Sequence, residues 1–199
     1  MKKLLCILVS ILLLCACTGK KDDITSNSAI KNSVELKTST FSIDGYEFFD
    51  KNATIAIKKI GFNEALRMFD EKGTGIVVWG YQGCPYCQRA LPVLNDAAVE
   101  SGIDVYYVDL RAEDIANMSD DEWMESYSSL VNNLADILTV EDGEPVMYVP
   151  EVVAIKDGKI VGHHLSLVES FDCSVQNEMN EDQKLDLINI YLDMIKKLQ

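Results

Sequence analysis

Continuous apolar runs divide the chain into segments with the character of buried strands. Residues 75–80 and 103–110 form two such runs, which is typical of strands that are buried on both faces. Residues 151–156 and 159–164 are joined through Asp157-Gly158, a dipeptide that favours a tight turn between paired strands. The pattern therefore predicts two buried strands followed by a β-hairpin.

Apolar residues at helical spacing fill most of the intervals between these strands. The predicted helices cover residues 64–71, 85–101, 120–138 and a last segment with Leu185, Ile188, Leu192 and Ile195 on its buried face. Asn63, Ser119 and Asn180 stand at the positions of N-caps. Ahead of the first helix, residues 46–49 and 54–57 have β character. This order of elements predicts an α/β fold in which a central mixed sheet carries helices on both sides.

The N-terminal segment has the pattern of a secretory signal peptide. Lys2 and Lys3 precede an apolar run over residues 4–16, which is shorter than the ~20 residues that span a bilayer. The run closes with Leu14-Cys15-Ala16-Cys17, which resembles the bacterial lipobox. The resemblance implies cleavage before Cys17 and attachment of diacylglyceryl to its sulfur, which gives a stable double-chain membrane anchor. A plain signal peptide and an uncleaved anchor are the alternatives.

Composition then divides the chain into three parts. We expect a signal peptide over residues 1–16, a lipidated flexible tether over 17–40 and one folded domain over 41–199, because residues 18–40 are polar with few large apolar groups. The chain has 199 residues and 22.2 kDa, which suffices for a domain with a hydrophobic core. A net charge of −14 excludes a generic nucleic-acid-binding protein, and a hydrophobic content of 48% argues against disorder of the whole chain.

Two of the six cysteines occur in one motif, Cys84-Pro85-Tyr86-Cys87, at a predicted helix start. There, unpaired backbone N–H groups and the helix dipole stabilise a thiolate at Cys84. Pro85 suits the first helical position because its missing donor would be unpaired anyway. Cys87 lies on the same helical face and can close a disulfide with Cys84. An attacking thiolate with a resolving thiol one turn inward is what thiol–disulfide exchange needs.

This motif and its surroundings resemble the thioredoxin superfamily over roughly residues 54–198. An apolar strand before Cys-x-x-Cys, a second strand ending in Asp109, and Tyr148-Val149-Pro150 before the hairpin occur in that family's order. The tetrapeptide is similar to that of glutaredoxins, and residues 156–159 are similar to thioredoxins. Thioredoxin-like bacterial lipoproteins, including bacteriocin-transport accessory proteins, resemble the chain most in their overall organisation.

The resemblance implies a thioredoxin-like three-layer α/β/α fold with a central mixed sheet. It also implies a helical insertion before the strand that follows the family's cis-proline, which is Pro150 here. It implies that Pro150 is cis and packs beside the active disulfide. Val149 would offer its backbone to an extended substrate segment, in the manner of an added strand. Pro85 and Tyr86 complete the substrate-binding residues that the resemblance implies.

The chain also departs from the family pattern. Val78 stands where thioredoxins carry a buried carboxylate that helps to move a proton, so another group or solvent is expected to do so. Gly83 replaces the tryptophan that usually abuts the first cysteine. The stretch between Asp109 and Pro150 is longer than the minimal connection, and its added helix either walls a substrate groove or caps the core. An apolar stripe along that helix predicts core packing and consists of Trp123, Tyr127, Leu130, Leu134 and Ile137.

These observations predict a membrane-tethered, extracytoplasmic thiol–disulfide oxidoreductase that needs no cofactor and acts on protein thiols and disulfides with an unidentified redox partner. A zinc or copper site would need further ligands, for which Cys173, His163 and His164 are the candidates. Cys173 is otherwise a buried small residue or a third redox thiol. A thioredoxin fold that binds a partner without exchanging electrons, as in bacteriocin export, is the remaining alternative.

Overall fold

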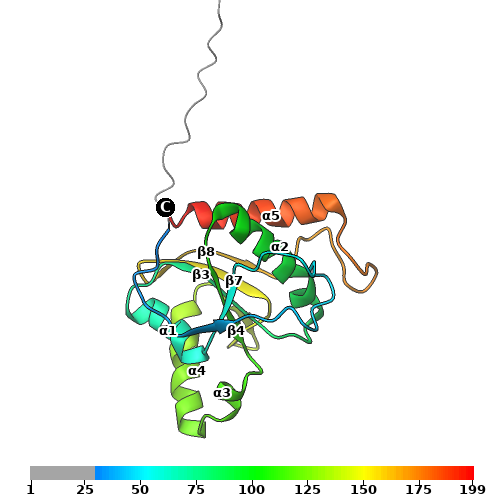
Figure 1. Ribbon diagram of the computed structural model, residues 1–199. Coiled ribbons are helices and arrows are strands. Elements are labelled where there is room, and N and C mark those ends of the chain that lie inside the picture. The colour runs from blue at the N-terminus through cyan, green and yellow to red at the C-terminus, as the bar shows by residue number, and fades with distance from the viewer. Residues whose placement is uncertain (1–29) are drawn as a thin grey trace, which may run out of the picture.

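The computed structural model describes residues 30–199, which form an α/β domain around a mixed six-stranded sheet (Figure 1). The sheet has the order β1 (Thr38–Thr40), β2 (Ile57–Ile60), β4 (Val105–Asp109), β3 (Gly75–Gly80), β7 (Glu151–Lys156) and β8 (Lys159–Leu165). Strands β2, β4 and β3 are parallel to one another, whereas β1, β7 and β8 pair antiparallel with their neighbours. A separate hairpin pairs β5 (Thr139–Glu141) with β6 (Glu144–Val146). The predicted mixed sheet is therefore confirmed.

Helices cover both faces of this sheet. The helices within residues 30–199 are α1 (Phe62–Asp70), α2 (Pro85–Ser101), α3 (Glu113–Ala116), α4 (Asp120–Leu134) and α5 (Glu181–Lys196). Side chains of β3 alternate between two hydrophobic clusters: Ile76 and Val78 pack with α2 and α5, and Val77 and Trp79 pack with α1 and α4. All six residues of β3 are buried, as its continuous apolar run predicts.

Helix α2 has the predicted bounds because both of its ends carry strong signals. Cys84 is the N-cap residue, with extended backbone, and Pro85 takes the first helical position. Gly102 ends the helix in the left-handed region at a φ of 66°, where a glycine carries no steric penalty. The capping boxes at Ser119 and Asn180 are likewise present.

Two element boundaries differ from the prediction. Helix α1 begins at Phe62 with Gly61 as its N-cap, so the expected cap at Asn63 is wrong. The Asn63 side chain instead accepts a hydrogen bond of 2.8 Å from Ser126 of α4, which joins the two helices. Helix α4 ends at Leu134 rather than near residue 138, because the next residues turn toward strand β5.

The β character expected for residues 46–49 is also wrong. This stretch forms turns, and its Tyr46 and Phe49 side chains pack inward against Phe41 and Tyr107. Alternating aromatic residues bury themselves equally well from a turn, since the burial does not require strand pairing. The strand expected over residues 54–57 begins only at Ile57.

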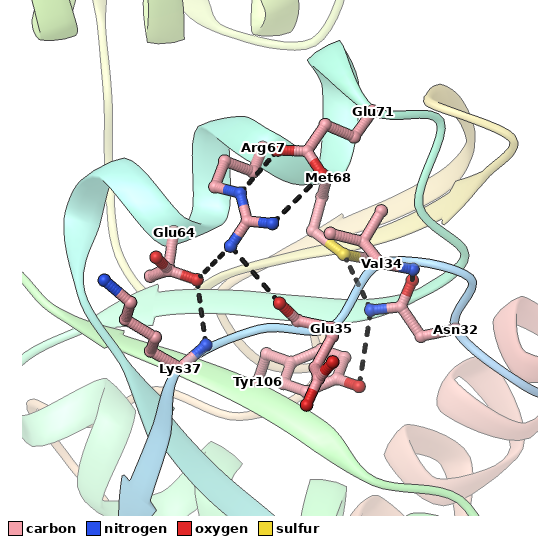
Figure 2. A network of polar contacts seen from close by, with 9 residues as sticks. All are labelled: Asn32, Val34, Glu35, Lys37, Glu64, Arg67, Met68, Glu71 and Tyr106. Carbon is pink, nitrogen blue, oxygen red and sulfur yellow. Dashed lines mark hydrogen bonds and ion pairs between the residues drawn. The ribbon is translucent and has the colours of Figure 1, made fainter.

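Residues 30–40 belong to the fold, although the sequence analysis assigns them to a flexible tether. We call residues 30–37 the N-terminal strap; it lies beside α1, whose Glu64 and Arg67 contact it (Figure 2). Asn32 holds the strap, because its Oδ1 accepts the backbone N–H groups of Val34 and Thr74, each at 3.1 Å. Arg67 of α1 donates to the carbonyl oxygen of Glu35 at 3.2 Å. Val34 is buried, and β1 continues the strap into the sheet.

The predicted signal peptide, the lipidation site Cys17 and the first part of the tether lie outside the described residues. Within residues 30–199, no helix combines the length and the apolar character needed to cross a bilayer.

Candidate active site: a cysteine pair at the start of helix α2

The predicted cysteine pair lies where the buried strand β3 gives way to α2. After Gly80 the chain turns, and the Cys84 N–H donates to the carbonyl oxygen of Tyr81 at 3.1 Å. This turn places Cys84 at the N-cap of a 17-residue helix. The free N–H groups of the first helical turn therefore point toward the Cys84 sulfur.

The two thiols form one unit in the structure. The backbone N–H of Cys87 donates to Cys84 Sγ at 3.3 Å, so the cysteine side chain itself caps the helix. Cys84 is 3% exposed and Cys87 is fully buried, and both are free thiols. Pro85 and Tyr86, between them in the chain, are exposed beside the site. The geometry thus gives an outer and an inner sulfur on one helical face.

The electrostatic environment separates the two thiols. A hydrogen bond from the Cys87 side chain, supported by the N–H groups of Cys87 and Tyr86 and by the charge of Arg111, lowers the pKa of Cys84 to about 6 despite its burial. The same hydrogen bond, together with burial, raises the pKa of Cys87 above its ordinary value. At neutral pH Cys84 is therefore the thiolate and Cys87 the thiol.

The predicted substrate-binding residues Val149 and Pro150 lie next to this pair. The Val149–Pro150 peptide bond is cis, as expected. The carbonyl oxygen of Val149 lies 3.6 Å from Cys84 Sγ and accepts the S–H group when Cys84 is protonated. Tyr148, just before them, is 45% exposed. The structure therefore brings Cys84, Val149 and Pro150 together, with Tyr86 at the exposed rim.

Behind Cys87 lie two tyrosines that the sequence did not single out. A Cβ atom added to Gly80 would lie 2.9 Å from Cys87 Sγ and 3.5 Å from a ring carbon of Tyr107, so the glycine lets both groups approach. The hydroxyl groups of Tyr46 and Tyr107 are 3.1 Å apart and buried. Burial raises the pKa of Tyr46 to about 12 and that of Tyr107 further still, so both hydroxyls stay protonated.

Val78, at the position of the expected family carboxylate, is completely buried in apolar surroundings. The polar groups near Cys87 on this side of the sheet include the paired hydroxyls of Tyr46 and Tyr107 and the buried hydroxyl of Tyr191. Tyr107 faces this side of the sheet because it is paired in register with Val78 of β3. The alternation along β4 puts Tyr107 on one face of the strand, but no local motif indicates that this face lies next to Cys87.

Arg111 is a third residue that the sequence did not single out. Its guanidinium carbon lies 3.7 Å from the centre of the Tyr81 ring, over the turn that leads to Cys84. A nitrogen of the same group lies 3.8 Å from where a Cβ on Gly83 would be. Arg111 reaches this place because it follows β4, whose last residue, Asp109, pairs with Gly80.

The candidate metal ligands His163, His164 and Cys173 have different neighbours and do not form a common site with the cysteine pair. His163 Nδ1 lies 3.0 Å from an oxygen of the buried Glu151. His164 packs against Tyr191, and burial lowers its pKa. Cys173 is a half-buried free thiol whose pKa burial raises. Across residues 30–199, no three His, Cys, Asp or Glu side chains come together as a metal-binding group.

The added helix α4 contributes to the core and to a surface hollow. Leu130 and Leu134 of the predicted stripe are buried, whereas Trp123 and Tyr127 are half-buried and stack at 5.3 Å. These rings line an apolar hollow of about 290 Å³, together with Met147 and its neighbours. The middle of the stripe is therefore core, and Trp123 and Ile137 pack partly buried against it.

Comparison of the chain with models of known protein families finds no match, and comparison with curated proteins finds none either.

Proposed function

We propose that this chain is a thiol–disulfide oxidoreductase with a thioredoxin-like fold. The observation that carries the proposal is the pairing of Cys84 and Cys87: two free thiols on one helical turn, the outer with a pKa of about 6 and the inner with a raised pKa. A dithiol with one activated and one protonated sulfur suits stepwise disulfide exchange. The neighbouring Val149 carbonyl supports it, because an extended peptide can pair with backbone at this place.

In the reductive direction, the Cys84 thiolate attacks one sulfur of a substrate disulfide, and the other substrate sulfur leaves as a thiolate that takes up a proton. Cys87 then loses its proton and attacks Cys84 Sγ in the mixed disulfide. The second substrate thiol is released, and a Cys84–Cys87 disulfide forms. Two electrons pass from the dithiol to the substrate, and the oxidative direction reverses each step. The protein's own sulfurs carry the electrons, so the proposal includes no cofactor.

We propose a lipid anchor at Cys17 that holds the domain outside the cytoplasm on the bacterial cell membrane, where it meets protein thiols and disulfides and a redox partner. The lipobox-like residues before Cys17 support this. In a bacterial host, Cys17→Ser should abolish the incorporation of labelled fatty acid into the protein. Equal labelling of the wild type and the variant would contradict the anchor.

The exchange activity is tested with a two-cysteine chain, which we define as the full chain, in nonionic detergent, with Cys6, Cys15, Cys17 and Cys173 replaced by serine. Equilibration with thiol–disulfide buffers should give a reversible Cys84–Cys87 disulfide with a potential of roughly −270 to −120 mV, the range of related dithiols. The same chain should catalyse insulin disulfide reduction by dithiothreitol. Cys84→Ser should abolish both, and full activity of that variant would overturn the proposal.

The alternative function, binding of a partner protein without electron exchange, predicts a different experimental result. If a partner captured by this chain is retained equally well after Cys84 and Cys87 are both replaced by serine, and no insulin reduction is seen, then a scaffold role holds and exchange does not.

A further inference from the structure

The chain contains three arginines, and two of them are fully engaged with other groups. Arg67 forms ion pairs with Glu64 at 2.7 Å and Glu71 at 2.5 Å. Arg89 donates to the carbonyl oxygens of Pro85 at 2.6 Å and Asn177 at 2.8 Å. Their donors are thus occupied by the protein itself.

Arg111, in contrast, is exposed and, among the described residues, has unoccupied donors. Its side chain is exposed, and within residues 30–199 its guanidinium group makes no hydrogen bond and no ion pair. The Tyr81 ring supports one face of the group at 3.7 Å and leaves its edge of five N–H donors open. The neighbouring carboxylate of Asp109 is already used, because it accepts the Arg111 backbone N–H and pairs with Lys59 at 3.2 Å.

The position of this free cation is next to the reacting sulfur. Arg111 packs beside Gly83, the residue immediately before Cys84, and its charge helps to stabilise the Cys84 thiolate. Because Gly83 carries no side chain, nothing at that position separates the guanidinium from the approach to Cys84. A planar fork of donors in such a place binds a carboxylate in two-point geometry.

We propose that Arg111 is a specificity-determining residue that selects thiol and disulfide substrates with a carboxylate next to the reacting sulfur. The inference rests on the proposed exchange activity and names its substrate class: acidic peptides or small anionic thiols. Within a chain of net charge −14, a local cation is needed to bring such an anion to the site.

The test compares two disulfide probes on the reduced two-cysteine chain. One is the dianionic 5,5′-dithiobis(2-nitrobenzoate), and the other is the neutral 4,4′-dithiodipyridine. A change in the reactivity of Cys84 itself affects both probes, so the ratio of their rates isolates recognition of the negative charge. Arg111→Met should lower the anionic-to-neutral ratio by about twofold to fivefold, the range for one solvent-accessible charge pair. Arg111→Lys should lower it less, because it keeps the charge and loses the fork.

Lys58→Met is the matched control, because it removes the same charge from an exposed ion pair with Asp104. That variant should leave the ratio unchanged. Raising the salt from about 0.01 M to about 1 M should remove the difference in ratio between the wild type and Arg111→Met, each measured at the same salt. An equal ratio in wild type and Arg111→Met would overturn the role of Arg111 and leave the exchange activity standing. A Cys84 that reacts with neither probe would overturn both.

Discussion

The sulfur of Cys84 lies 3.6 Å from the backbone carbonyl oxygen of Val149, although 65 residues separate the two in the chain. The contact joins the start of α2 to the loop before β7, and these elements meet because β3 and β7 are neighbouring strands. The sulfur that we propose as the nucleophile therefore lies beside a backbone carbonyl of another segment. A peptide that pairs with Val149 would carry its own sulfur to Cys84.

The hydrogen bond from the Cys87 side chain is the largest cause of the low pKa of Cys84. Cys87→Ala should therefore raise the pKa of Cys84 above about 6 and slow its alkylation by iodoacetamide at neutral pH. Cys87→Ser keeps a donor and should raise the pKa less. Thiolate absorbance as a function of pH in the two-cysteine background measures both. A pKa that is the same in all three chains would show that Cys87 does not activate its neighbour.

Gly80 should be intolerant of a side chain, because an added Cβ would lie 2.9 Å from Cys87 Sγ. Gly80→Ala should displace that sulfur, destabilise the reduced protein by about 1–3 kcal/mol and raise the pKa of Cys84. Gly83→Ala is the matched control, since its nearest neighbour would be 3.8 Å away. Denaturant unfolding and thiolate titration of both variants provide the comparison, and equal behaviour of the two would refute the packing argument.

The Tyr46–Tyr107 hydroxyl pair should show strong coupling. Either single change to phenylalanine leaves one buried hydroxyl without its partner and should cost about 1–3 kcal/mol of unfolding free energy. The double variant should cost less than the sum of the singles, because it leaves no unpaired hydroxyl. Urea unfolding of the four chains measures the coupling. Additive losses would mean that the two hydroxyls act independently.

Glu151 should make stability fall as the pH rises. Burial raises its pKa to about 6, from an ordinary value of 4.5, so the folded protein keeps this proton to higher pH than the unfolded chain does. The unfolding free energy should therefore decrease from about pH 4.5 to above pH 6, by about 2 kcal/mol in total. Glu151→Gln should lack this decrease when its unfolding is measured over the same pH range.

His163→Gln is the companion variant for that measurement. The hydrogen bond and charge of His163 lower the pKa of Glu151, so their loss should move the decrease to higher pH and enlarge it. A Glu151→Gln protein whose pH profile matches that of the wild type would contradict the assignment.

Much of the framework follows from local sequence signals. Strands β3 and β7 and helix α2 have the predicted bounds, because a continuous apolar run, a hairpin dipeptide, and a proline and a glycine at the helix ends each act over a few residues. The position of the Cys84–Cys87 pair at a helix start follows for the same reason. The sequence alone therefore predicts the thiol–disulfide chemistry that we propose for the pair.

The features of the fold and the site that the sequence does not predict depend on contacts between distant segments. The N-terminal strap has a polar composition, yet Asn32 fixes it through hydrogen bonds to residues that lie far along the chain, such as Thr74. Arg111 and Tyr107 reach the site only through the register of β4 against β3. No periodicity or motif encodes such a register, because it results from how separate strands pair.

The strap also bears on how an anchored protein would face its surroundings. It is fastened beside Thr74, at the beginning of β3, whereas Cys84 follows the end of that strand. Six extended residues at about 3.3 Å each separate the two ends. If lipid is attached at Cys17, the anchored segment joins the domain near the end of β3 that lies opposite to the thiols. The point of attachment and the cysteine pair would then lie at opposite ends of the same strand.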